Sequence, residues 1–178
     1  MVSEIHVFDL DDTLVDSAAA VIGAYREAAQ QLGCILPSDF YGRSADEWNC
    51  PPQLHVLKCQ LYAAKYAAQV RRGWAAEAML RCKQLNNVRT EIWTAASLQS
   101  VVTLRNQPHL IDVLRPNEWY VRQTVQEKAN RFAHLYSNLT VPVAVWLHYY
   151  DDNPEHIETI TGRYIGGVVI HRKGAIVV

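Results

Sequence analysis

Near its amino terminus the sequence has a short apolar run, residues 5–8, that stops abruptly at four acids within the next eight residues. Such a run predicts a buried strand of a parallel sheet with the acids at its carboxyl end. Two carboxylates fixed there, Asp9 and Asp11, are costly unless a cation or a shared proton compensates them. A solvated Asp-rich turn is the plain alternative. A calcium loop of the EF-hand type fails, because Leu14 and Ala20 stand where that loop needs glycine and glutamate.

Helical periodicity follows this strand and then alternates with further strand-like runs. Ser17 and Ser97 are the expected N-caps of two helices, Gly33 ends the first helix, and Thr124 with Glu127 forms a capping box. The alternation predicts an α/β fold, with a Rossmann-like parallel sheet and flanking helices. We expect helices over about residues 17–32, 52–71, 74–85, 97–105, 124–136 and 154–161, strands over 90–94, 119–121 and 141–149, and a terminal hairpin of 164–171 and 175–178.

Length and composition limit the classes of function. The 178 residues fit one domain, and 49% apolar with 20% charged residues is ordinary for a globular protein. The net charge of −1 is spread evenly over the two halves, which argues against a long nucleic-acid footprint or an anionic membrane surface as the main partner. The longest apolar run, residues 141–147, is far below the ~20 residues of a membrane helix. The first twelve residues carry acids, unlike a signal peptide, so we expect a cytoplasmic protein.

The cysteines give little support for a metal or disulfide framework. There are four, none in a CxxC pair, and free thiols are the default in a reducing compartment. The one zinc-like group in the sequence, Cys50, His55 and Cys59, lacks a fourth ligand at a finger-like spacing. We therefore do not expect structural zinc.

Polar residues also lie near two later predicted strands, at three places in the sequence. Thr94 ends one strand, and the small residue Ala95 after it lets backbone N–H groups approach a bound anion. Lys128 lies one turn into the capped helix, and Asp151 and Asp152 follow the strand after it. Each position alone also fits a helix cap, a solvated charge or a turn. Their order along the chain, together with the first acid pair, is more specific than any one of them.

This order closely resembles the haloacid dehalogenase superfamily over about residues 4–155. The matching positions are the DxDxT motif Asp9-Leu10-Asp11-Asp12-Thr13, then Thr94, Lys128 and Asp151-Asp152. The resemblance implies one hydrolase domain over residues 1–178, with a small helical cap inserted after the first strand at about residues 17–72. It also implies a phosphatase, because true dehalogenases of the superfamily lack the second carboxylate, here Asp11.

The resemblance further implies a role for each matching residue. Asp9 would attack phosphorus and form an aspartyl phosphate, and Asp11 would act as general acid and then general base. Mg²⁺ would be held by Asp9, the backbone carbonyl of Asp11, Asp152 and Asp151. Thr94 and Lys128 would hold the remaining phosphoryl oxygens, and Thr13 and Ala95 would contact the substrate.

The cap bears on the choice of substrate. Its loop at residues 40–48 contains Tyr41, Arg43 and Trp48, which could stack a ring and grip a second anion, although Tyr41 and Trp48 could equally pack cap against body. A nucleotide is therefore the first expected substrate. The 3′ or 5′ end of a nucleic acid is the second, because residues 149–156 loosely resemble phosphatase modules of nucleic-acid repair proteins. A sugar phosphate is the third. A catalytically idle binding module and a phosphomutase are the alternatives of another class.

Overall fold

The computed structural model of the chain describes residues 2–41, 48, 50–137, 146–162 and 167–177. Within them, six strands form one sheet in the order β5-β4-β1-β6-β7-β8. Five of these strands run parallel, and β8 returns antiparallel to β7. The bounds are β1 Glu4–Phe8, β4 Val88–Trp93, β5 Glu118–Tyr120, β6 Trp146–Tyr150, β7 Val168–Arg172 and β8 Ala175–Val177. The predicted α/β class with a parallel sheet is confirmed.

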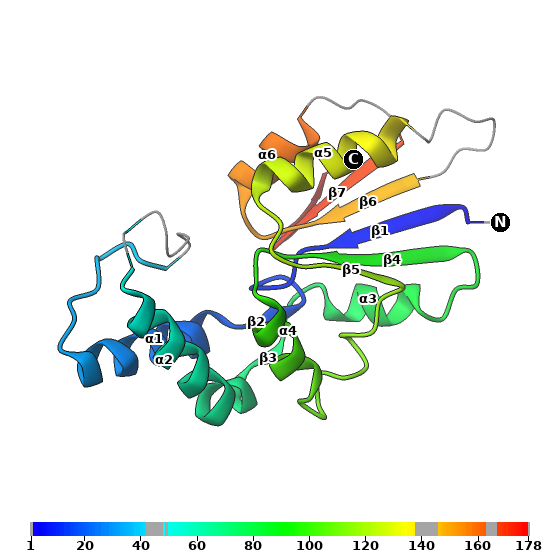
Figure 1. Cartoon of the computed structure of the whole chain (residues 1–178). Helices are drawn as coiled ribbons and strands as arrows, with labels where there is room; N and C mark the ends of the chain where they lie inside the picture. Colours follow the sequence, from blue (N-terminus) through cyan, green and yellow to red (C-terminus); the bar gives the residue numbers. More distant parts are fainter. Residues whose placement is uncertain (1, 42–47, 49, 138–145, 163–166, 178) are drawn as a thin grey trace.

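Helices cover both faces of this sheet (Figure 1). On one face, Phe8 and Ile92 pack with α3 (Ala76–Cys82) and α4 (Leu98–Arg105). On the other face, Val7 and Trp93 pack with α5 (Val125–Ser137) and α6 (Pro154–Thr161). Successive side chains of a strand point to opposite faces, so neighbouring residues of β1 and β4 enter different cores. The last two residues of each strand, Val7 with Phe8 and Ile92 with Trp93, are apolar and fully buried, as expected where both faces of a sheet are covered.

A helical layer lies apart from the sheet, at the end toward which β1 and β4 run (Figure 1). We call residues 18–69 the helical insertion; it contains α1 (Ala18–Leu32), α2 (Pro52–Leu61), a π-helical turn (Tyr62–Tyr66) and a 3-10 turn (Ala67–Gln69). A two-stranded antiparallel ribbon, β2 (Val15–Asp16) with β3 (Arg71–Arg72), joins it to the body. The sequence predicts its cap over nearly the same part of the chain, residues 17–72.

Local signals place most helix ends correctly. Gly33 ends α1 in the left-handed region with φ 64°, and Ser97 accepts a hydrogen bond from the Ser100 N–H at the start of α4. The capping box also forms, because Thr124 and Glu127 exchange reciprocal side-chain to backbone hydrogen bonds. The predicted helix over 52–71 ends early, through the π and 3-10 turns. Residues 141–145, 164–166 and 178 of the predicted strands lie outside the described residues.

The ribbon was not predicted, and it depends on a glycine. The Gly73 N–H donates to the Leu14 carbonyl at 2.8 Å. A Cβ at Gly73 would lie 2.2 Å from the Thr13 carbonyl oxygen, closer than any real contact. Two chain segments can therefore run side by side here because residue 73 has no side chain.

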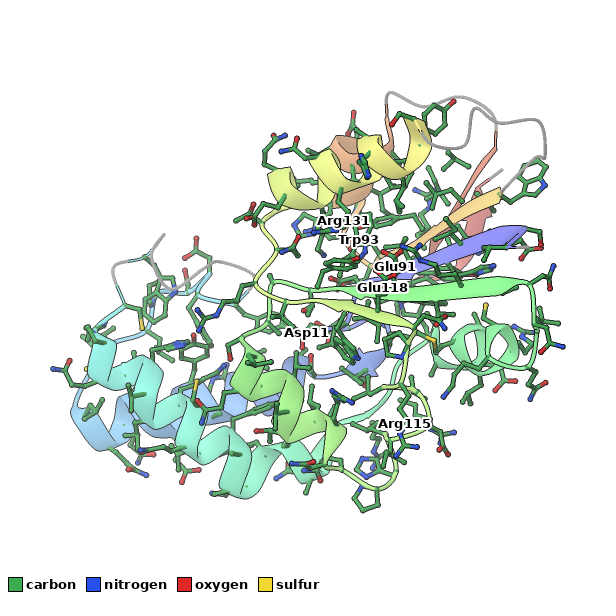
Figure 2. The ribbon with its side chains drawn as sticks, turned by 45° about the vertical axis from the view of Figure 1, so that its right-hand side comes forward. Asp11, Glu91, Trp93, Arg115, Glu118 and Arg131 are labelled. Atoms are coloured by element: carbon green, nitrogen blue, oxygen red, sulfur yellow. The ribbon has the colours of Figure 1, made fainter. Side chains whose placement is uncertain are left out.

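Charged side chains on the α5 face of the sheet contact one another or aromatic rings. The buried Glu91 carboxylate accepts a hydrogen bond from the Trp93 indole at 2.8 Å and forms an ion pair with Arg89. The Arg131 guanidinium, from α5, lies 3.5 Å above the Tyr120 ring centroid. Figure 2 shows Glu91, Trp93 and Arg131 grouped on this face, well away from Asp11, which lies between the sheet and the helical insertion. Within the described residues, no helix is long and apolar enough to cross a membrane.

Candidate active site

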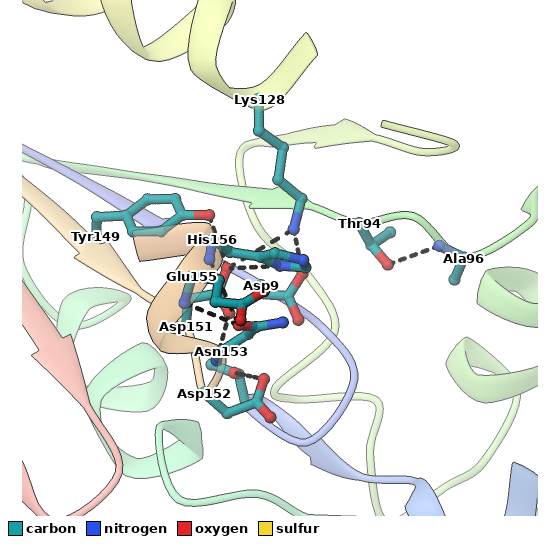
Figure 3. A network of polar contacts seen from close by, with 11 residues as sticks. Asp9, Thr94, Ala96, Lys128, Tyr149, Asp151, Asp152, Asn153, Glu155 and His156 are labelled. Carbon is teal, nitrogen blue, oxygen red and sulfur yellow. Dashed lines mark hydrogen bonds and ion pairs between the residues drawn. The ribbon is translucent and has the colours of Figure 1, made fainter. Parts of the chain in front are cut away.

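Three carboxylates meet at the carboxyl ends of two adjacent strands. Asp9 directly follows β1, and Asp151 and Asp152 directly follow β6. The two strands pair in parallel register, with Phe8 opposite Tyr150, so these acids leave the sheet side by side. One oxygen from each carboxylate lies within 4.8 Å of the others (Figure 3). The structure thus brings Asp9, from the first acid pair, together with Asp151 and Asp152, the last pair.

Lys128 enters this cluster from α5 (Figure 3). Its side chain is buried, and its ammonium lies 2.5 Å from Asp9 Oδ1 and 3.9 Å from Asp151 Oδ2. Burial alone would lower the pKa of Lys128, but the two carboxylates raise it overall, so the lysine stays charged. Burial raises the pKa of Asp9 to about 7, with the Asp151 charge adding to that effect and Lys128 opposing it.

Asp151 is held by groups that the sequence did not single out. The Tyr149 hydroxyl donates to Asp151 Oδ2 at 2.8 Å, and the Asn153 N–H donates to Asp151 Oδ1 at 2.9 Å. His156 Nδ1 lies 3.8 Å from the same carboxylate. Burial would raise the pKa of Asp151, but His156, Lys128 and these hydrogen bonds lower it overall. Of these groups, the sequence indicates only Asn153, because an Asn before a Pro is typical of a helix start, here that of α6.

Asp11 and Asp12, in the loop after β1, accept hydrogen bonds from different groups at the start of α1. The Ser17 hydroxyl donates to Asp11 Oδ1 at 2.6 Å, whereas Asp12 Oδ1 accepts from the backbone N–H groups of Ser17 and Ala18 at 3.1 and 2.9 Å. Ser17 therefore occupies the predicted N-cap position, but the capping oxygen comes from Asp12. Asp12 itself adopts φ 57°, which Asp tolerates better than most residues. Burial raises the pKa of Asp11 despite the Ser17 hydrogen bond.

Thr13 and Thr94 border the cluster. Thr13 is buried, and its hydroxyl donates to Asp152 Oδ1 at 3.3 Å. Thr94 is buried at the end of β4, where its hydroxyl accepts from the Ala96 N–H at 2.9 Å (Figure 3). Ala95 follows on the exposed side. Thr13 is therefore tied to the acidic cluster, whereas Thr94 follows β4, the strand next to β1.

Two residues of the predicted substrate loop, Tyr41 and Trp48, belong to the part of the chain that the structure describes. Trp48 packs inside the helical insertion, with its ring edge-on to Tyr25 at 5.9 Å and to Phe40 at 6.4 Å. The Tyr41 hydroxyl donates to Asp12 Oδ2, which brings Tyr41 to the acid loop. Arg43 lies outside the described residues. The contacts of Trp48 therefore favour a packing role over stacking with a substrate ring. The ring packs within the insertion, however, and not between the insertion and the body.

The donor set fits a hard divalent cation. Asp9, Asp151 and Asp152 offer carboxylate oxygens alone, the ligand type that Mg²⁺ prefers, and one ammonium cannot neutralise three clustered carboxylates. The zinc-like cysteines do not assemble into a comparable group: His55 Nε2 lies 3.7 Å from Cys59 Sγ, but among the described residues the groups able to hold a metal do not include these two.

Solved structures of similar shape support a fold assignment. CbbY from Rhodobacter sphaeroides, in complex with phosphate, has a TM-score of 0.67 at 16% identity, over 98% of this chain and 87% of that one. A haloacid dehalogenase-like family hydrolase from Streptococcus pneumoniae has a TM-score of 0.61 at 16% identity, over 89% and 80%. The chain has the haloacid dehalogenase-like fold. The resemblance inferred from the motifs is confirmed at the level of fold.

Sequence comparison finds relatives over part of the chain. No protein-family model matches the chain. Tyrosine-protein kinase PtkA of Mycobacterium tuberculosis, and its counterpart in Mycobacterium bovis, are 28% identical over 120 residues. That match covers 61% of this chain and 38% of the relative, so the chain spans well under half the length of these relatives. A solved PtkA structure has a TM-score of 0.59 at 20% identity, over 93% of this chain and 82% of that one.

Proposed function

We propose that the chain is a magnesium-dependent phosphomonoester hydrolase that works through an aspartyl phosphate on Asp9. The observation that carries the proposal is the meeting of Asp9, Asp151 and Asp152 around the buried Lys128 ammonium. Phosphoryl transfer requires a nucleophilic carboxylate, a site for a metal cation and a positively charged side chain that binds the phosphoryl group. All three are present at this edge of the sheet.

Asp9 is the nucleophile in this proposal. One of its oxygens attacks phosphorus, the bond from phosphorus to the ester oxygen breaks, and the leaving oxygen takes a proton from Asp11. Asp11 then accepts a proton from water, whose oxygen attacks the phosphorus of the acyl phosphate and releases inorganic phosphate and Asp9. The raised pKa of Asp11 supports the acid step, because that carboxyl keeps a proton closer to neutral pH than an exposed one.

The remaining polar groups bind and orient. Lys128 and the Thr94 hydroxyl would hold phosphoryl oxygens, and Thr13 and the Ala95 backbone would complete that pocket. Mg²⁺ would be held by Asp9, Asp152, Asp151 and the backbone carbonyl of Asp11. When bound, it would neutralise charge on the transferring phosphoryl group. The tight hold of Tyr149 and Asn153 on Asp151 supports a positioning role for Asp151, with the more exposed Asp152 as the more direct ligand.

A small phosphorylated molecule is the substrate class with the best support. CbbY has been solved with phosphate and with xylulose-(1,5)-bisphosphate, both small anions. The nucleotide expectation rests on the loop with Tyr41, Arg43 and Trp48 and on the compact cap, and the packing of the Trp48 ring inside the insertion weakens one part of that argument. The helical insertion would act as the cap that closes over such a substrate.

Similarity to PtkA favours a second candidate, phosphoryl transfer to a protein tyrosine. The same aspartyl phosphate would then be discharged by a phenol oxygen in place of water. Incubation with γ-labelled ATP and a tyrosine-containing peptide separates the two candidates. Labelled peptide supports transfer to tyrosine, and labelled inorganic phosphate supports hydrolysis.

The main test is phosphate release from a panel of nucleotides, sugar phosphates and short phosphate esters, with EDTA, with Mg²⁺ and with Ca²⁺. We expect activity that EDTA removes, Mg²⁺ restores and Ca²⁺ inhibits, since Ca²⁺ prefers longer bonds and more ligands. Asp9→Asn should abolish turnover, and Asp112→Asn, on an exposed carboxylate of the body, is the matched control. Turnover by Asp9→Asn, or turnover in EDTA, would contradict the mechanism.

A further inference from the structure

Three histidines lie side by side on one face of the sheet, on the neighbouring strands β1, β6 and β7 (Figure 1). His6 is directly opposite His148 in the parallel register, and their rings are stacked with centroids 4.0 Å apart and planes within 6°. His171 is opposite Tyr150, two residues further along β6. Alternate residues of a strand point to the same face, so these side chains share the face on which Phe8 packs with α3. The register of the sheet thus brings together imidazoles from distant parts of the sequence.

Glu4, at the start of β1, adds a carboxylate to this group. Its Oε2 lies 2.9 Å from His6 Nε2 and 4.0 Å from His148 Nε2. The metal-binding atoms of Glu4, His6 and His148 all lie within 4.8 Å of one another. Both Nε2 atoms therefore face one carboxylate, which is the arrangement in which three side chains can share a metal ion.

The other ring nitrogen of each of these two histidines is held by a second polar group. His6 Nδ1 is 3.0 Å from the Tyr150 hydroxyl, and His148 Nδ1 is 2.9 Å from His171 Nε2. A histidine that binds a metal through one nitrogen usually donates a hydrogen bond from the other, which fixes the orientation of its ring. The tyrosine oxygen and an unprotonated Nε2 can both accept such a hydrogen bond. Tyr150 and His171 are thus placed as positioning residues for the two imidazoles.

The two imidazoles are neutral, and the carboxylate is within reach of solvent. Burial lowers the pKa of His6, and it lowers the pKa of His148 to about 4. Both rings therefore keep a nitrogen lone pair free at neutral pH. The Glu4 side chain is 35% exposed, whereas those of His6 and His148 are 8% and 17% exposed, so an ion can enter from the Glu4 side.

We propose that Glu4, His6 and His148 form a second metal site, which binds a divalent transition-metal ion of the Zn²⁺ type. Two imidazole nitrogens and one carboxylate oxygen suit Zn²⁺ better than Mg²⁺, and three protein ligands leave the fourth tetrahedral position for water. The site lies on a face of the sheet and not at its carboxyl edge, because His6 precedes Asp9 by three residues, or about 10 Å of strand. The ion joins β1 to β6, the two strands that the clustered acids follow, and its binding does not depend on phosphatase activity.

Metal titration of the full chain, after treatment with EDTA and dialysis, tests this site. We expect one strong Zn²⁺ site per chain by calorimetry, and a Tm that rises with Zn²⁺ because the ion binds the folded state. Glu4→Gln and His148→Phe should each weaken Zn²⁺ binding about a hundredfold. Glu4→Gln keeps a side-chain oxygen that can accept the hydrogen bond from His6, so this variant removes the charged ligand with little change to the fold.

Three further variants separate this site from other places where Zn²⁺ could bind. His171→Phe removes only a positioning group and should weaken binding about tenfold. His134→Gln, on α5 at the other face of the sheet, is the matched histidine control, and Asp152→Asn is the control for Zn²⁺ at the clustered acids. Both controls should keep the wild-type affinity.

Co²⁺ in place of Zn²⁺ gives a spectroscopic check on the ligands. We expect visible absorption bands of four-coordinate Co²⁺ without the near-ultraviolet bands of a cobalt–thiolate bond. The same Zn²⁺ affinity in the wild type, Glu4→Gln and His148→Phe would overturn the proposal. A cobalt–thiolate spectrum, or a loss of affinity in either control as large as in His148→Phe, would also overturn it.

Discussion

Lys128→Met removes the one buried ammonium among the acids while nearly keeping the side-chain volume. Lys128 contacts Asp9 at 2.5 Å and Asp151 at 3.9 Å. Breaking a buried ion pair by removing one partner costs about 3–5 kcal/mol when the other partner stays charged. The variant is expected to be inactive, because Lys128 would no longer hold a phosphoryl oxygen beside Asp9.

The pKa of Asp9 determines how the stability lost by Lys128→Met depends on pH. In the folded protein that pKa is about 7, above the value of about 3.9 in an unfolded chain. Ionisation of Asp9 therefore destabilises the fold as pH rises from about 4 to 7, and removal of Lys128 extends this range upward. Below pH 7 Asp9 is protonated in both proteins, so its contribution to the difference is small. Above pH 7 each pH unit adds up to about 1.4 kcal/mol to the cost of the substitution, until the variant also ionises.

Urea unfolding in EDTA at pH 6, 7, 8 and 9 measures this difference. We expect the stability lost by Lys128→Met to be larger at pH 9 than at pH 6 by about 2–3 kcal/mol, from two units of pH at ~1.4 kcal/mol each. In an Asp9→Asn background the cost of Lys128→Met should no longer depend on pH over this range. A pH-independent cost in the wild-type background, or the same slope in the Asn background, would refute the assignment of the coupling to Asp9.

Three further predictions concern the metal, the ribbon and the helical insertion. Asp152→Ala should raise the Mg²⁺ concentration needed for half-maximal activity more than Asp151→Ala does, and equal effects would mean that the two acids share the role. Gly73→Ala should cost about 1–3 kcal/mol or more by thermal unfolding, because its Cβ would lie 2.2 Å from the Thr13 carbonyl oxygen, and an unchanged Tm would show that the ribbon opens without cost. Trp48→Ala should cost about 2–3 kcal/mol in urea unfolding, less than the ~3–5 kcal/mol of a fully buried Trp. It should affect nucleotides and p-nitrophenyl phosphate alike, and a KM increase confined to nucleotides would restore the stacking role.

Several features followed from sequence because they depend on neighbours along the chain. The apolar run that ends at Asp9 predicted a strand with acids at its carboxyl end, and β1 is that strand. The exchange of hydrogen bonds between Thr124 and Glu127 needs three residues of separation and nothing else. Gly33 ended a helix for an equally local reason, its tolerance of positive φ. Strand and helix alternation then restricted the arrangement to a parallel sheet.

The contacts that give the site its chemistry needed the tertiary structure. The ammonium of Lys128 contacts Asp9 across 119 positions of sequence, and only the docking of α5 on the sheet brings them together. Nothing in the sequence distinguishes the buried Lys58 from the exposed Lys65, and a pattern rich in aromatic residues does not reveal that Trp48 faces the interior of the insertion. Local patterns fix backbone conformation through short-range sterics and hydrogen bonds. Burial, charge pairing and pKa depend on which distant surfaces pack together.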